Sequence, residues 1–219
     1  MPLALQPNTK LVMIGDSITD CGRARPVGES GLDASGLGSG YVGLVNALLQ
    51  SGSPEQHIRV VNVGASGNTV RDLKARWKTD VTDLQPDWLS IMIGINDVWR
   101  QFDSPLQPEG HMALAEYDAT LNGLVRRVRP RLKGLILMTP YFIEPLRSDP
   151  MRARMDEYGA VVRRIADAER AILVDTQAAF DSLLQHVHPM TIAWDRVHPN
   201  PTGHMLLARA FLDALGFEW

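Results

Sequence analysis

The chain has 219 residues, of which 45% are hydrophobic and 21% are charged, and its formal net charge is -3. This length and composition predict one globular domain over residues 1–219, and in the absence of a basic run or a long apolar run we expect no nucleic-acid partner and no membrane partner. The N-terminal segment lacks the pattern of a secretory signal and Cys21 is the single cysteine, so we expect a cytoplasmic protein.

Short apolar runs alternate along the chain with amphipathic stretches. The apolar runs cover residues 10–14, 59–63, 88–93, 135–138 and 171–174. Continuous apolar runs of this length favour strands that are covered on both faces, as in a parallel sheet. The helical patterns cover residues 41–49, 69–79, 114–128, 150–169, 177–186 and 201–215. This alternation predicts an α/β fold, a three-layer α/β/α sandwich with a parallel sheet.

Polar residues follow the first three apolar runs at the points where they end. In a parallel sheet, chemistry takes place at the carboxyl ends of the strands. The first such group is the motif Gly-Asp-Ser at residues 15–17. A serine at a strand-to-helix turn can present its hydroxyl at the sheet edge and its N–H at a positive helix terminus. Ser17 is therefore either a nucleophile or simply the cap of a helix.

A serine hydroxyl needs a base that accepts its proton. Asp195 and His198 are three residues apart ahead of the last predicted helix. This spacing lets the carboxylate reach Nδ1 of the imidazole and leaves Nε2 free to face a hydroxyl. Taken alone, the pair also fits a surface cap, so the prediction depends on the other motifs.

Two further residues are candidates for an oxyanion hole, a set of donors that stabilises a tetrahedral intermediate. Gly64, after the second apolar run, can offer a backbone N–H with no side chain in the way, and Asn96, after the third, can offer its side-chain amide. The alternatives are a tight turn at Gly64 and a turn-capping role for Asn96.

These motifs occur in the order that is typical of one family, and the pattern resembles the SGNH (GDSL-type) hydrolase superfamily. The resemblance implies that Ser17 is the nucleophile and a backbone oxyanion donor, with Gly64 and Asn96 as the second and third donors. It implies that His198 is the general base and Asp195 its orienting acid. It also implies a flavodoxin-like fold around a five-stranded parallel sheet.

The sequences that flank these motifs are similar to those of intracellular bacterial acetylxylan esterases. The similar segments are residues 13–23, 66–73, 95–100 and 193–199. This resemblance implies a small acetylated carbohydrate as the substrate, specifically acetylated xylo-oligosaccharides. It further implies no metal or organic cofactor, and assembly into a homo-oligomer, since enzymes of this kind can form homo-octameric rings.

Four residues are expected to bind substrate: Asp16, Trp99, Arg100 and Trp194. Trp99 can stack on a sugar face or pack in the core, and Arg100 can bind a hydroxyl. Trp194 can form a wall of the acyl pocket or lie at a subunit contact, although core packing is the simpler interpretation. A glycine-rich loop over residues 28–40 and the segment 141–151 are expected to border the site.

Two other functions stay open at this point. The same triad can serve a lysophospholipase or an acyl-thioesterase, and the fold can serve as a non-catalytic carbohydrate-binding module. The intact Ser17, Asp195 and His198 argue against the non-catalytic function. A preference for short or long acyl chains would distinguish the esterases.

Overall fold

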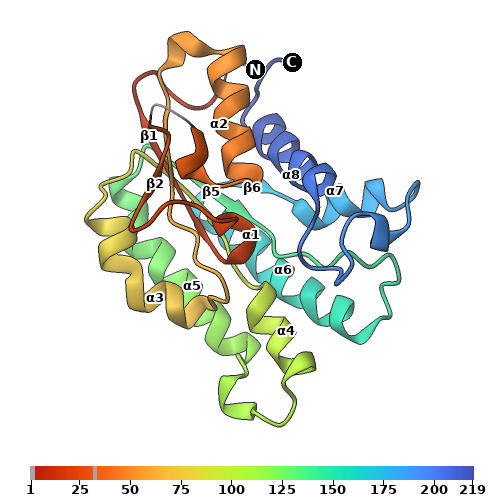
Figure 1. The fold of residues 1–219 in the computed structure, drawn as a ribbon. Helices are drawn as coiled ribbons and strands as arrows, with labels where there is room; N and C mark the ends of the chain where they lie inside the picture. The colour runs from red at the N-terminus through yellow and green to blue at the C-terminus, as the bar shows by residue number, and fades with distance from the viewer. Residues whose placement is uncertain (1–2, 32–33) are drawn as a thin grey trace.

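The computed structural model describes residues 3–31 and 34–219, and Figure 1 shows a central sheet with helices on both of its faces. Over these residues, six strands form one sheet in the order β2-β3-β1-β4-β5-β6. In chain order the strands are β1 (Lys10–Gly15), β2 (Gly28–Glu29), β3 (Arg59–Asn62), β4 (Trp88–Met92), β5 (Gly134–Met138) and β6 (Ile172–Val174).

Five of these strands are parallel, with β1 between β3 and β4. The parallel strands follow the order of a flavodoxin-like fold, as predicted. Every residue of β4 and β5 is buried, which explains why both strands are apolar apart from Ser90 of β4. Leu11 of β1 pairs with Val60 on one side and with Trp88 on the other.

The sixth strand was not predicted. β2 pairs antiparallel with β3 at the edge of the sheet, and it lies inside the glycine-rich segment Gly28–Gly40 that we expected to be a loop. A two-residue strand has no apolar pattern by which it could be recognised. The same segment contains a short 3-10 helix, Ala34–Leu37, and its residues 32–33 lie outside the described part of the chain.

The helices form two layers around the sheet (Figure 1). On one face α8 packs against α2 and α7, and on the other face α5 packs against α3 and α6. The α-helices are α1 (Ser17–Asp20), α2 (Tyr41–Gly52), α3 (Val70–Trp77), α4 (Ile95–Asp103), α5 (Leu114–Val128), α6 (Pro150–Glu169), α7 (Thr176–Leu183) and α8 (Pro201–Ala214).

Two differences from the predicted helices concern the segments after β3 and β4. α3 ends at Trp77 and continues as a π-helical turn over Lys78–Thr82, where the sequence pattern predicted a single helix. α4 was not predicted because its first turn, which follows Gly94 directly, consists of residues assigned to a catalytic motif. That turn is buried, so packing stabilises the helix more than its local propensity does.

The strand ends bring the polar motifs to one edge of the sheet. Gly15, the last residue of β1, pairs with Met92, the last residue of β4. A Cβ at Gly15 would lie 2.5 Å from the Met92 carbonyl oxygen and 2.2 Å from Thr19 Oγ1, so a glycine is required there. The close approach of β1, β4 and α1 places the segments after both strands side by side.

Candidate active site

The candidate nucleophile lies on a single helical turn directly after the central strand. Asp16 caps this turn, and its Oδ1 accepts a hydrogen bond from Ile18 N at 3.0 Å. Ser17 is the first residue of α1, and Cys21 ends the helix in a left-handed conformation with φ of 40°. None of the described residues accepts a hydrogen bond from the Ser17 N–H, which leaves this donor available at the helix N-terminus.

Ser17, His198 and Asp195 form a continuous chain of hydrogen bonds. The distance from Ser17 Oγ to His198 Nε2 is 2.8 Å, and that from His198 Nδ1 to Asp195 Oδ2 is 2.7 Å. Asp195 Oδ1 also accepts the backbone N–H groups of Val197 at 3.0 Å and His198 at 2.9 Å. The turn before α8 therefore fixes both side chains with respect to each other, as the three-residue spacing predicted.

The burial of the two partners differs in a way that suits a base and its orienting acid. The Asp195 side chain is 8% exposed, whereas that of His198 is 42% exposed. Burial opposes ionisation of Asp195, but hydrogen bonds from the His198 ring and from two backbone N–H groups outweigh it and lower the pKa of this carboxyl. The charged carboxylate can then stabilise an imidazolium at His198.

Asn96 is held at both ends of its amide group. It lies in the first turn of α4, its Nδ2 donates to the Asn68 carbonyl oxygen at 3.0 Å, and its Oδ1 accepts from Arg100 Nη2 at 3.3 Å. An amide nitrogen carries two hydrogens, so one donor remains for a ligand. This geometry fits the predicted oxyanion role of Asn96.

The structure contradicts Gly64 as an oxyanion donor. Its N–H is buried and donates to Asn62 Oδ1 at 2.9 Å, so it is already used within the protein. Gly67 has the properties that were expected of Gly64. It is exposed, has open space around its Cα and a φ of +80°, and none of the described residues accepts a hydrogen bond from its N–H. Its immediate neighbour Asn68 binds Asn96.

The expected substrate-binding role of Asp16 is also wrong. Its side chain is buried within the turn that it caps, where substrate cannot reach it. Burial raises the pKa of Asp16 to about 7 against the opposing effect of the Ile18 hydrogen bond, and the nearby Asp97 adds to the increase. Burial likewise raises the pKa of Asp97 to about 7. Both acids lie next to site residues in sequence, but each is buried and accepts a hydrogen bond from a backbone N–H.

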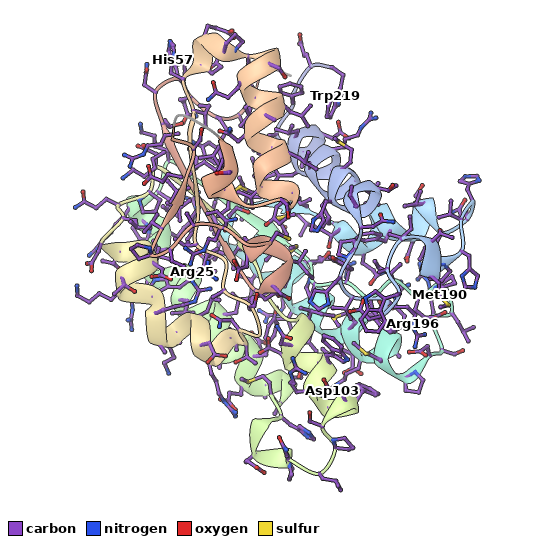
Figure 2. The ribbon with its side chains drawn as sticks, viewed as in Figure 1. Arg25, His57, Asp103, Met190, Arg196 and Trp219 are labelled. Atoms are coloured by element: carbon purple, nitrogen blue, oxygen red, sulfur yellow. The ribbon has the colours of Figure 1, made fainter. Side chains whose placement is uncertain are left out.

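A cavity of about 310 Å³ lies beside the triad and includes Asp195 in its lining. The Trp99 ring borders it, and its centroid lies 5.7 Å from that of the His198 ring. The labelled residues Asp103 and Arg196 in Figure 2 come from α4 and from the segment before α8, and both line this cavity. The full lining is Trp99, Phe102, Asp103, Phe142, Asp149, Pro150, Met151, Asp195 and Arg196.

The position of this cavity supports some of the predicted contacts and not others. The segment 141–151 borders the cavity through Phe142 and Met151, as expected from its place after β5. Arg100 instead binds within the protein, because it forms an ion pair with Asp103 and a hydrogen bond with Asn96. Its guanidinium lies 5.0 Å from the centroid of the Trp99 ring.

Trp194 neither lines this cavity nor packs in the core. Its side chain is 81% exposed, so the simpler interpretation as a core residue is wrong. A tryptophan with this exposure fits a contact with another molecule better than it fits packing within one chain.

A larger cavity, of about 950 Å³, lies at the opposite edge of the sheet. Lys74 and Trp77 of α3 line it together with Asp87, which directly precedes β4. No triad residue borders this cavity, and we therefore assign the chemistry to the carboxyl edge despite the larger volume at the other edge.

Two general features of the described residues bear on the kind of site. None of the helices in residues 3–31 and 34–219 is long and apolar enough to cross a membrane. Over the same residues, no three side chains of His, Cys, Asp or Glu are grouped so that they could hold a metal ion.

Comparison with known proteins gives consistent matches over nearly the whole chain. The model of the GDSL-like Lipase/Acylhydrolase family matches residues 13–206. An acetylxylan esterase from Geobacillus stearothermophilus is 60% identical over 210 residues, which cover 96% of this chain and 95% of that protein. The crystal structure of an acetylxylan esterase from the same organism has a TM-score of 0.97 and 58% identity, with 99% of this chain and 98% of that chain covered.

Further solved structures add to this comparison. An alpha/beta hydrolase enzyme from the metagenome of Lake Arreo, Spain, has a TM-score of 0.95 and 56% identity, with 98% of both chains covered. Three other similar structures are of catalytic mutants of the Geobacillus acetylxylan esterase, in which a serine, an aspartate or a histidine is replaced by alanine.

Proposed function

This chain belongs to the GDSL-like lipase/acylhydrolase family and is a carboxylic ester hydrolase, and from this premise we propose that it removes acetyl groups from acetylated xylo-oligosaccharides. The observation that carries the proposal is the hydrogen-bonded chain from Ser17 through His198 to Asp195, beside a cavity of about 310 Å³. The similarity to an acetylxylan esterase supports the choice of substrate.

The geometry supports catalysis through an acyl-enzyme. His198 Nε2 accepts the Ser17 hydroxyl proton as Oγ attacks the acetyl carbonyl carbon. His198 then donates this proton to the sugar oxygen, which leaves as an alcohol. In the second half-reaction His198 deprotonates a water molecule, which attacks the acyl-enzyme and releases acetate. Asp195 keeps Nδ1 protonated in both halves.

We assign the oxyanion to three donors. These are the Ser17 N–H, the Gly67 N–H and the free amide hydrogen of Asn96. Gly67 takes the role that sequence reasoning gave to Gly64, because the Gly64 N–H is bound to Asn62. Removal of one such donor typically lowers the rate by about 100- to 1000-fold.

Trp99 is the residue that we assign to sugar binding. It is half-buried, it borders the cavity, and its ring lies next to that of His198. A flat aromatic face at this place can stack on a sugar ring while the acetyl group points to Ser17. Arg100 supports Asn96 in this assignment and does not contact the sugar.

The test combines two sets of substrates. Purified protein is mixed with acetylated xylo-oligosaccharides and, separately, with 4-nitrophenyl esters that range from acetyl to dodecanoyl. We expect rapid release of acetate from the sugars and a decline in kcat/KM as the acyl chain lengthens, because the cavity is small. A preference for long chains would move the substrate to lipids or acyl thioesters and contradict the carbohydrate proposal.

The matched control is Ser17→Ala. We expect this variant to keep its fold and to lose activity by several orders of magnitude, because no other hydroxyl is hydrogen-bonded to His198 Nε2 in the described residues. Turnover by Ser17→Ala at the wild-type rate would exclude the acyl-enzyme mechanism whatever the substrate.

We also propose that the protein forms a homo-oligomer in the cytoplasm, with the octamer as the form that its resemblance implies. The exposure of Trp194 at 81%, of Met190 at 64% and of Trp219 at 57% supports an association surface. The lone cysteine supports a reducing compartment. Sedimentation velocity tests the assembly, and a monomer at micromolar concentration would contradict it.

A further inference from the structure

Arg76 connects four separate acceptors with one side chain. It lies on α3 and its side chain is 17% exposed. Its Nη2 donates to the Gly15 carbonyl oxygen at 2.8 Å and its Nε to Asn68 Oδ1 at 2.6 Å. Its Nη1 donates to the Val63 carbonyl oxygen at 2.5 Å and to Asp80 Oδ2 at 2.6 Å.

Two of these acceptors adjoin the proposed oxyanion donors. The Gly15 carbonyl precedes Ser17 by two residues at the end of β1. Asn68 directly follows Gly67, and its carbonyl oxygen accepts the hydrogen bond from Asn96 Nδ2. One guanidinium therefore binds two groups: the backbone two residues before Ser17, and Asn68, which both follows Gly67 and accepts the hydrogen bond from Asn96.

The other contacts of Arg76 stabilise the same arrangement. Val63 is the first residue after β3, so its bond with Arg76 joins the start of the loop over residues 63–69, which contains Gly64 and Gly67, to α3. Ala65 N donates to the Gly15 carbonyl oxygen at 3.0 Å, which joins this loop to β1 directly. Asp80 forms an ion pair with Arg76 and compensates its charge.

We propose that Arg76 is a positioning residue that sets the relative placement of the three oxyanion donors. The proposal rests on the assignment of Ser17, Gly67 and Asn96 made above. An oxyanion hole lowers the barrier only when its donors are fixed before the reaction, and small displacements weaken it. The donors come from three segments after β1, β3 and β4, and Arg76 joins these segments through the Gly15 carbonyl and Asn68.

Lysine cannot replace arginine here. Its ammonium is a single point on a flexible chain, while the planar guanidinium directs several N–H groups at once. In Arg76→Lys the Gly15 carbonyl and Asn68 would no longer share one rigid partner, although the positive charge beside Asp80 would remain. The variant therefore loses the simultaneous hydrogen bonds to the Gly15 carbonyl and Asn68, and it keeps the positive charge beside Asp80.

The first measurement is the split between kcat and KM on the acetyl ester. For Arg76→Lys we expect kcat to fall by about 10- to 100-fold with KM changed by less than about threefold, because the donors act on the transition state. The matched control is Arg71→Lys on the same helix, where an exposed arginine forms an ion pair with Glu116. We expect this control to keep wild-type kcat and KM.

A second measurement separates positioning from general stability. Methylboronic acid forms a bond from boron to Ser17 Oγ while His198 Nε2 accepts the hydroxyl proton, and the resulting tetrahedral boronate anion resembles the transition state. We expect its Ki to rise in Arg76→Lys by the same factor by which kcat/KM falls, while binding of the deacetylated xylo-oligosaccharide stays constant. Titration of the active serine with a fluorophosphonate normalises every value to the folded fraction.

Each outcome has a definite meaning. Arg76→Lys with wild-type kcat, or with reduced activity but an unchanged Ki for the boronate, overturns the proposal. If Arg76→Lys does not fold, Asn68→Ala removes one acceptor of Arg76 and keeps the Asn68 carbonyl, and retention of wild-type kcat in this variant overturns the proposal as well. Failure of the proposed function shows instead as turnover by Ser17→Ala, independently of Arg76.

Discussion

At the scale of single residues, the Asp195 carboxylate fixes which nitrogen of His198 carries the proton. Its Oδ2 accepts from Nδ1 while its Oδ1 accepts the backbone N–H groups of Val197 and His198. In Asp195→Asn the backbone bonds can persist, but the amide NH2 would face Nδ1 and move the proton to Nε2. Nε2 could then no longer accept the proton of Ser17.

We therefore expect Asp195→Asn to lower kcat by about 10,000-fold, with little change in the melting temperature. The measurement is steady-state hydrolysis of the acetyl ester, together with thermal unfolding. Asp118→Asn is the control, because it makes the same change at a surface ion pair with Arg164. A loss of less than about tenfold in Asp195→Asn would show that the carboxylate does not set the tautomer.

The sequence was sufficient to predict that the side chains of the candidate triad are hydrogen-bonded to one another, and insufficient to distinguish the candidate backbone donors. Ser17, Asp195 and His198 can be recognised in the sequence by residue type and local motif. In the folded chain the three side chains are hydrogen-bonded to one another. A backbone N–H carries no residue-specific signal. Gly64 and Gly67 are both glycines after the same strand, and they differ only in the folded chain, where the Gly64 N–H is buried and bound to Asn62 while Gly67 is exposed.

At the scale of elements, the turn from β1 to α1 depends on the absence of a side chain at Gly15. A Cβ there would lie 2.2 Å from Thr19 Oγ1 and 2.5 Å from the Met92 carbonyl oxygen. Because Met92 O is backbone of the adjacent strand, the turn itself would have to move. The displacement would shift both the Ser17 hydroxyl and its N–H.

For Gly15→Ala we expect a loss of about 1–3 kcal/mol in the free energy of unfolding and a fall in kcat of at least about tenfold. Urea unfolding and ester hydrolysis provide the two values. Gly123→Ala is the control, because a methyl group on this α5 glycine would have no other atom within 4 Å and alanine favours a helix. We expect Gly123→Ala to be more stable by about 0.5–1 kcal/mol with unchanged activity.

The elements that the sequence predicted well are those with a long, regular pattern. α5 and α6 have the predicted bounds, Leu114–Val128 and Pro150–Glu169, because their apolar positions repeat over several turns. β2 has two residues and α4 begins in a catalytic motif, so neither offered such a pattern. Tertiary contacts define these elements, and contacts of that kind are absent from a linear sequence.

At the scale of the whole molecule, buried titratable groups make stability depend on pH. Burial raises the pKa values of Asp16 and Asp97 from 3.8 to about 7. Between about pH 4 and pH 7 the folded protein therefore retains two protons that the unfolded chain has released. The stability that these groups contribute is complete below about pH 4 and is lost as the pH rises through about 7. His204 acts in the opposite sense, because burial lowers its pKa from 6.5 to about 4.

The two acids together change the free energy of unfolding with pH more than His204 does, because they retain two protons and His204 excludes one. The variant Asp97→Asn isolates the contribution of one acid. We expect the variant to gain about 2–4 kcal/mol of unfolding free energy relative to wild type between about pH 5 and pH 8. Urea unfolding at both pH values measures this change. Asp118→Asn, at a surface ion pair, should show a constant difference from wild type, and an equally constant difference in Asp97→Asn would show that Asp97 is ionised throughout.

The Ser17–His198 hydrogen bond joins positions that are 181 residues apart in the chain. During synthesis on the ribosome, the nucleophile emerges early and its base emerges only after all the strands of the sheet. A nascent chain whose turn before α8 has not yet been synthesised contains Ser17 but lacks His198. We expect such a chain not to hydrolyse esters. Hydrolysis therefore requires both translation through His198 and folding that brings His198 to Ser17.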